Sequence, residues 1–206
     1  DLWLSTLAEA ELRALQYDWN FWARPAQRIP DTLPNGKKWK TAVICCGRGW
    51  GKTRVAAEFV RRKITSGECR HMALVGPSAN DVRKVMVEDV RTFGSGMMQV
   101  CPPEDLPEYS PTRRLLYLEK YDAACSLYSG EEPELLRGPA HDGAWVDEIM
   151  RMKKQEAVWD MLQFGLRGAT NAQVVVTTTP KPTDLMRQLV VASNTIVIGG
   201  STVDND

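Results

Sequence analysis

The chain has 206 residues, which predicts one domain with additional structure and not two complete domains. Hydrophobic residues make up 43% and charged residues 25%, an ordinary globular composition that excludes disordered, collagen-like and coiled-coil proteins. The 26 Lys and Arg residues balance 26 Asp and Glu residues, so any contact with nucleic acid must come from a local patch or an assembly.

Cysteine usage and apolar run lengths indicate the compartment. Five cysteines, an odd number with no C-x-x-C spacing, argue against a disulfide framework or a zinc site. No apolar run approaches the roughly 20 residues that span a bilayer, and no basic and apolar leader opens the chain. We expect a soluble, cytoplasmic protein without a membrane anchor. The start at Asp1 and the end at Asp206 suggest a piece of something longer.

Hydrophobic periodicity predicts the elements in chain order. Helical spacing predicts a helix over residues 4–22, and prolines predict a turn-rich loop over 24–39. Short apolar strands then alternate with longer helices, which is typical of a mostly parallel sheet covered on both faces. The expected strands are 40–46, 72–75, 143–146, 172–177 and 195–198, and the expected helices are 52–65, 79–92, 155–166 and 184–191. Segments 113–118 and 124–128 predict an inserted β-hairpin.

A glycine-rich segment, CGRGWGKT at residues 46–53, follows the first long strand and leads into a helix. We call it the phosphate loop, because glycines let backbone N–H groups surround phosphates at a helix N-terminus. Lys52 is expected to reach the β- and γ-phosphates of ATP, and the Thr53 hydroxyl to face Mg²⁺. The expected ATP-binding residues of this Walker A type segment are Gly47, Arg48, Gly49, Trp50, Gly51, Lys52 and Thr53.

The phosphate loop departs from the strict motif, which would have glycine at Cys46. It also fails as a dinucleotide-binding fingerprint, since the third glycine would fall on Lys52. The competing interpretation is a glycine-rich strand–helix turn with a chance Lys-Thr pair. The strand before the loop and the helix after it favour a nucleotide site.

Two further segments complete the expected site. The apolar run before Asp147 and Glu148 predicts that these acids lie at a strand's C-terminal edge, where Asp147 would anchor Mg²⁺ and Glu148 would polarise the attacking water. The competing interpretation is a charge pair at a helix start. A strand over 174–179, inserted between the phosphate-loop strand and the acidic strand, would bring Thr178 or Thr179 to the γ-phosphate. Alternatively, these threonines simply fill a β-strand.

Together the three segments resemble the ATPase domain of the large terminase subunit, the DNA-packaging motor of tailed bacteriophages and gene-transfer particles. The resemblance extends from Trp22 to Thr202, and its most specific parts are segments 47–53, 136–148 and 177–180. The family's loop lacks the first glycine and has an early arginine, and Cys46 and Arg48 match that pattern.

The resemblance implies roles for individual residues. Gln27 would hydrogen-bond the adenine edge, and Arg48 would touch the γ-phosphate within its own subunit. Arg137 would act as an arginine finger across a ring interface, and Thr177 to Thr179 would couple hydrolysis to movement. The alternatives are a surface glutamine, a solvent-facing loop cation, and a helix-end arginine paired with one of the glutamates at 131, 132 and 134.

The resemblance also implies an additional-strand P-loop ATPase fold over 1–206, with an N-terminal helix and adenine-side loop over 1–39 and the ATPase core over 40–206. A nuclease domain would lie beyond Asp206 and is not assigned to this chain. The implied activity is Mg²⁺-dependent ATP hydrolysis that moves double-stranded DNA into a procapsid in the host cytoplasm. The implied partners are a homo-oligomeric ring, the portal protein and the small terminase subunit, with no membrane.

Two alternatives stay open at this point. One is another additional-strand motor, such as a helicase or recombinase relative. The other is a nucleotide-binding switch with little turnover, against which Glu148 argues. Glu58 and Asp142 are the next candidates for the catalytic carboxylate. The basic clusters at 37–40, 61–63, 113–114 and 151–154 are candidate DNA-phosphate contacts, although solvated faces are the usual reason for such clusters. His71 and His141 are expected to be structural or surface residues.

Overall fold

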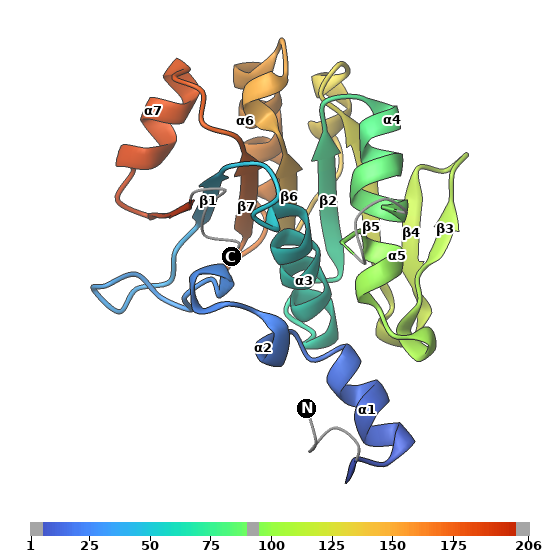
Figure 1. Cartoon of the computed structure of the whole chain (residues 1–206). Coiled ribbons are helices and arrows are strands. Elements are labelled where there is room, and N and C mark those ends of the chain that lie inside the picture. Colours follow the sequence, from blue (N-terminus) through green and yellow to red (C-terminus); the bar gives the residue numbers. More distant parts are fainter. Residues whose placement is uncertain (1–5, 90–94, 201–206) are drawn as a thin grey trace.

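The computed structural model describes residues 6–89 and 95–200. In these ranges eight strands form one sheet in the order β3-β4-β5-β2-β6-β7-β1-β8 (Figure 1). Neighbours from β5 to β8 pair in parallel, whereas β3, β4 and β5 pair antiparallel. The strands are β1 Thr41–Cys46, β2 His71–Gly76, β3 Glu108–Ser110, β4 Leu115–Leu118, β5 Ala123–Ser129, β6 Gly143–Asp147, β7 Gln173–Thr178 and β8 Thr195–Gly200.

Helices cover both faces of the sheet. Figure 1 shows α3, α4 and α5 on the near face, while α6 and α7 contribute side chains to the hydrophobic cluster of the opposite face. The α-helices are α1 Glu9–Gln16, α2 Trp19–Trp22, α3 Lys52–Thr65, α4 Ala79–Asp81, α5 Met97–Val100, α6 Gln155–Leu166 and α7 Asp184–Val191. Within the described ranges no helix has the length and apolar character needed to cross a membrane.

The expected alternation of strands and helices is confirmed, including a strand between the phosphate-loop strand and the acidic strand, since β7 lies between β1 and β6. The first expected helix is wrong as a single element. Asp18 interrupts it, because its carboxylate accepts hydrogen bonds from the backbone N–H groups of Asn20 and Phe21 and so starts α2 separately from α1. Residues 4 and 5 of that expected helix lie outside the described ranges.

Two other elements differ from expectation. The helix expected over 79–92 is α-helical only in α4 and continues as a π-helical segment, η3 Val82–Glu88; its last residues, 90–92, lie outside the described ranges. The expected hairpin exists as β4 and β5, but β5 also pairs in parallel with β2, so the hairpin extends the main sheet. Its outer neighbour β3 was not predicted, because three residues are too few for a periodic signal.

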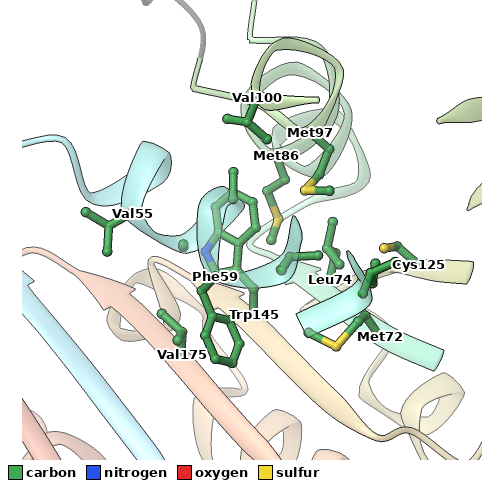
Figure 2. Packing of buried hydrophobic residues seen from close by; sticks show 14 of the residues in the cluster. Val55, Phe59, Met72, Leu74, Met86, Met97, Val100, Cys125, Trp145 and Val175 are labelled. Carbon is green, nitrogen blue, oxygen red and sulfur yellow. The ribbon is translucent and has the colours of Figure 1, made fainter. Parts of the chain in front are cut away.

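Alternating side chains of the strands divide the core into two layers. Trp145 and Val175 point to the layer under α3, together with Phe59 of that helix (Figure 2). Their neighbours Val146 and Val176 point to the layer covered by α6 and α7. Because both faces of the central strands are buried, these strands are almost continuously apolar until the polar residues at their C-terminal ends.

His141 is buried beside Tyr128, with ring centroids 5.5 Å apart, and is 2% exposed. Neither ring nitrogen has a hydrogen-bond partner among the described residues. Burial lowers the pKa of His141, and the positive charge that His71 carries when protonated acts in the same direction, while Asp142 opposes it. The imidazole is therefore held neutral in the folded protein.

We predict that His141 makes the fold acid-sensitive. A histidine whose pKa is lower in the folded state stabilises the protein above its unfolded value of about 6.5, and this contribution is lost as the pH falls. His141→Leu should reduce the loss of stability between roughly pH 7.5 and pH 5.5, measured by urea denaturation at both values. An equal pH dependence in the variant and the wild type would contradict this assignment.

Candidate functional site

The phosphate loop connects β1 to α3 through two glycines with positive φ angles, 78° at Gly49 and 96° at Gly51. Such backbone angles are unfavourable for residues with a Cβ atom. The Lys52 side chain turns back across the loop, where its Nζ donates hydrogen bonds of 2.9 Å to the carbonyl oxygens of Cys46 and Gly47. The lysine charge is therefore concentrated at the mouth of the loop.

Gln27 connects the N-terminal region to the phosphate loop. Its Nε2 donates to the Trp50 carbonyl oxygen at 2.9 Å, and its Oε1 accepts from the backbone N–H of Arg24 at 3.1 Å. The Arg24 guanidinium donates to the same Trp50 carbonyl at 2.7 Å. Gln27 is buried, so the alternative of a surface glutamine is wrong. Its adenine contact stays a prediction.

Trp50 anchors the phosphate loop to β8. Its indole is 1% exposed and packs so closely on Gly200 that a Cβ atom there would collide with the ring. The backbone N–H of Gly47 also donates to the Gly200 carbonyl oxygen at 3.2 Å. The backbone N–H of Trp50 is therefore the group that remains for its expected ATP contact.

Asp147 lies at the end of β6 and is 6% exposed. Its Oδ1 accepts a 2.6 Å hydrogen bond from the Thr177 hydroxyl of β7. Burial raises the pKa of Asp147 to about 6; the Thr177 hydrogen bond opposes this shift, the Glu148 charge adds to it, and Lys52 opposes it. These influences place Asp147 and Glu148 in the electrostatic neighbourhood of the phosphate-loop lysine.

Glu148 has a left-handed backbone, with φ 48° and ψ 41°. A non-glycine residue in this region carries roughly 1–3 kcal/mol of strain, which proteins tolerate mainly at functional sites. Its backbone N–H donates to the Thr177 carbonyl oxygen at 2.6 Å, and its Oε2 accepts from the Thr179 hydroxyl at 3.1 Å and the Thr179 backbone N–H at 3.3 Å. Thr178 points elsewhere, fully buried, with its hydroxyl donating to the Thr179 carbonyl oxygen.

Arg48 and Arg137 are both exposed. Arg48 lies in the phosphate loop, and Arg137 directly follows the short helix η6 Pro133–Leu136. In the part of the chain that the structure describes, neither side chain forms an ion pair or hydrogen bond. The alternative pairing of Arg137 with a nearby glutamate is therefore wrong, and Glu132 pairs instead with Arg114 at 2.8 Å.

The other candidate carboxylates have structural partners. Glu58 is buried within α3 and forms ion pairs of 2.8 Å with Arg54 and 3.3 Å with Arg61. Asp142 precedes β6, at the end opposite Asp147, and accepts hydrogen bonds from the backbone N–H groups of residues 70 and 71. Glu148 is therefore the carboxylate that fits best beside the phosphate loop.

Comparison with known proteins agrees with this geometry. The family model described as "Terminase large subunit, T4likevirus-type, N-terminal" matches residues 43–194. The chain belongs to this terminase family. No curated protein sequence matches it.

Two solved structures illustrate the shared terminase fold. The ATPase domain of the Thermus phage P74-26 large terminase is 14% identical, with a TM-score of 0.66, covering 94% of this chain and 86% of that one. The large terminase of a second, thermophilic bacteriophage, solved in complex with ADP, is also 14% identical, with a TM-score of 0.65, covering 94% of this chain. The match spans only 45% of that second protein. At these identities the likeness shows the fold alone.

The donor set of this terminase domain fits Mg²⁺. Among the described residues no group of three or more His, Cys, Asp or Glu side chains could hold a metal ion. Magnesium in nucleotide sites is usually held by one or two protein oxygens together with phosphates and water. Thr53, in the first turn of α3, and Asp147 supply such oxygens.

Part of the basic surface has a structural role. Arg61 donates to the Tyr17 carbonyl oxygen at 2.8 Å as well as pairing within α3, Arg62 pairs with Asp31 at 3.0 Å, and Lys63 is buried and pairs with Glu68. Cluster 61–63 is therefore mainly a set of packing contacts. Contacts between DNA and the other clusters stay predictions.

We predict that Gly51→Ala disables the phosphate loop beyond the cost of its backbone angle. An alanine Cβ would lie 2.6 Å from Gln27 Nε2. Gly36→Ala is the matched control, because Gly36 also has a positive φ, 79°, but nothing within 4 Å of the added Cβ. The control should lose about 1–2 kcal/mol of stability and keep nucleotide affinity. Gly51→Ala should lose more stability and also nucleotide affinity, measured by thermal denaturation and calorimetry; equal effects would show that the Gln27 contact is unimportant.

Proposed function

We propose that this domain hydrolyses ATP with Mg²⁺ and thereby powers the movement of double-stranded DNA into a procapsid. The observation that carries the proposal is the meeting of three features at adjacent strand ends: the Lys52 loop after β1, the threonines of β7, and Asp147 and Glu148 of β6. Ligands of open α/β sheets bind beyond the carboxyl ends of the strands.

In this proposal the phosphate loop binds the triphosphate. Lys52 exchanges its contacts with the carbonyls of Cys46 and Gly47 for β- and γ-phosphate oxygens. Gln27 contacts adenine from its position against the loop. Thr53 and Asp147 hold Mg²⁺, which when bound neutralises phosphate charge.

Glu148 then activates water. Its Oε2, held by Thr179, accepts a proton from a water molecule aligned with the γ-phosphate. The charge that develops on the transferred phosphoryl group is met by Lys52 and by Arg48 from the same subunit. Arg137 of a neighbouring subunit adds a further positive charge, so hydrolysis depends on assembly.

The remaining parts of the proposal concern the complete motor. The large terminase of the thermophilic bacteriophage has been solved with ADP and with ATP-γ-S, which supports a nucleotide as the ligand of this fold. We propose a homo-oligomeric ring in the host cytoplasm that docks on a portal protein and receives DNA with the small terminase subunit. Residues 1–39 form the adenine-side region, residues 40–206 form the ATPase core, and a nuclease domain would follow in the complete subunit.

The first test separates binding from hydrolysis. Lys52→Ala should lose both, because a cation is removed from the phosphate site. Glu148→Gln should keep ATP affinity and lose turnover by roughly 10²–10⁴-fold, the usual cost of removing a general base. Calorimetry gives the affinity, and a steady-state phosphate-release assay gives the rate. Wild-type turnover in Glu148→Gln would move the base elsewhere, and unchanged ATP binding in Lys52→Ala would reject the nucleotide site.

The second test asks whether Arg137 acts between subunits. Arg137→Ala should bind ATP normally but lose the hydrolysis gained on assembly, since arginine fingers contribute about 10³–10⁵ in rate. Mixing Arg137→Ala subunits, which have intact pockets, with Glu148→Gln subunits, which have intact fingers, should restore part of the activity. If mixing restores nothing while wild-type rings are active under the same conditions, Arg137 does not act across the interface.

A further inference from the structure

We propose that Trp145 is a positioning residue for the proposed magnesium ligand Asp147, acting through the Thr177 hydroxyl. In this arrangement the indole N–H of Trp145 fixes the direction of the hydroxyl, and the hydroxyl fixes the Asp147 carboxylate. The inference rests on the proposed function, because it gives that carboxylate an oriented second oxygen for Mg²⁺. We call the three residues the Trp–Thr–Asp relay.

The relay follows from strand register. Trp145 and Asp147 are two residues apart on β6, so their side chains share the face of the sheet that α3 covers. On β7, Val175 is opposite Trp145 and Thr177 is opposite Asp147. Thr177 is thus the direct cross-strand neighbour of the acid and the diagonal neighbour of the tryptophan, and long side chains reach diagonal neighbours.

The hydrogen bonds of the relay run in one direction. Trp145 Nε1 donates to Thr177 Oγ1 at 3.0 Å, and Thr177 Oγ1 donates to Asp147 Oδ1 at 2.6 Å. An indole N–H can only donate, so it occupies an acceptor site of the hydroxyl and leaves the hydroxyl proton for another acceptor. The Val146 carbonyl oxygen, at 3.4 Å, is the more distant alternative. The short hydrogen bond to the carboxylate is the stronger one.

Water cannot replace any member of the relay, because Trp145 and Thr177 are both fully buried and Asp147 is nearly so. A buried indole N–H without a partner costs about 1–3 kcal/mol. The Trp145 ring is held in the core cluster with Phe59 and Val175 (Figure 2). Packing therefore fixes the donor, and the donor fixes the hydroxyl, whereas a phenylalanine would pack similarly but could not donate.

The test compares two tryptophans. Trp145→Phe removes the donor of the relay, and Trp39→Phe is the matched control, since Trp39 is also buried but donates its Nε1–H to the Pro30 carbonyl oxygen, outside the proposed site. ADP affinity is measured by calorimetry without Mg²⁺ and across a Mg²⁺ titration. Trp145→Phe should keep its Mg²⁺-free ADP affinity and require roughly 10–100-fold more Mg²⁺ for the full effect, the usual cost of losing a residue that orients a metal ligand. Trp39→Phe should match the wild type.

Substitutions of Thr177 identify the path. Thr177→Val should reproduce the Mg²⁺ requirement of Trp145→Phe, and Thr177→Ser, which keeps the hydroxyl, should restore wild-type behaviour. The double variant Trp145→Phe/Thr177→Val should be no worse than Thr177→Val alone, because both changes interrupt one path. If Trp145→Phe does not fold, the contrast between Thr177→Val and Thr177→Ser still tests whether the hydroxyl positions Asp147.

Three outcomes would overturn the inference. They are a normal Mg²⁺ requirement in Trp145→Phe, additive losses in the double variant, and a Thr177→Ser variant as impaired as Thr177→Val. All three concern variants measured beside a wild type whose ADP affinity responds to Mg²⁺. A wild type without that response would instead reject the proposed magnesium site itself, so the two failures are distinguishable.

Discussion

Parallel pairing of β7 between β1 and β6 is the constraint on which the candidate site depends. It brings the ends of three strands to one edge, although β1 is separated from the other two by a long stretch of the chain. The lysine of the phosphate loop and the two acids have no direct covalent relation and are positioned by backbone hydrogen bonds of the sheet. Anything that changed the register of β7 by one residue would turn Thr177 to the opposite face and separate it from Asp147.

The alternation of side chains along β7 gives its threonines different tasks. Thr177 faces the α3 side and bonds Asp147, whereas Thr178 is buried toward the opposite side. Thr179, beyond the strand, bonds Glu148. Each acid therefore has its own threonine. Because both threonines lie in one short segment, a displacement of that segment would alter the surroundings of both carboxylates together.

Much of this arrangement could be predicted from the sequence. Glycine spacing, the Lys-Thr pair and the acidic ends of apolar strands are local signals, and α3, α6 and α7 have the predicted bounds. The remainder depends on contacts that are distant in sequence. The burial of Trp50 against Gly200 and of Gln27 against the loop reflects tertiary packing that no local pattern records. The break at Asp18 was a local signal, since an aspartate before a helical segment is a common N-cap, and the apolar periodicity concealed it.

The contact between Trp50 and Gly200 has a mechanical consequence. Gly200 ends β8, an edge strand, and the polypeptide leaves the sheet at this point. The phosphate loop touches that exit through both a tightly packed ring and the hydrogen bond from Gly47. A change in loop shape would therefore be applied at the pivot of whatever follows β8. Since glycine at this pivot has no side chain to yield, the indole would press directly on the backbone, and little of the displacement would be lost in rotamer changes.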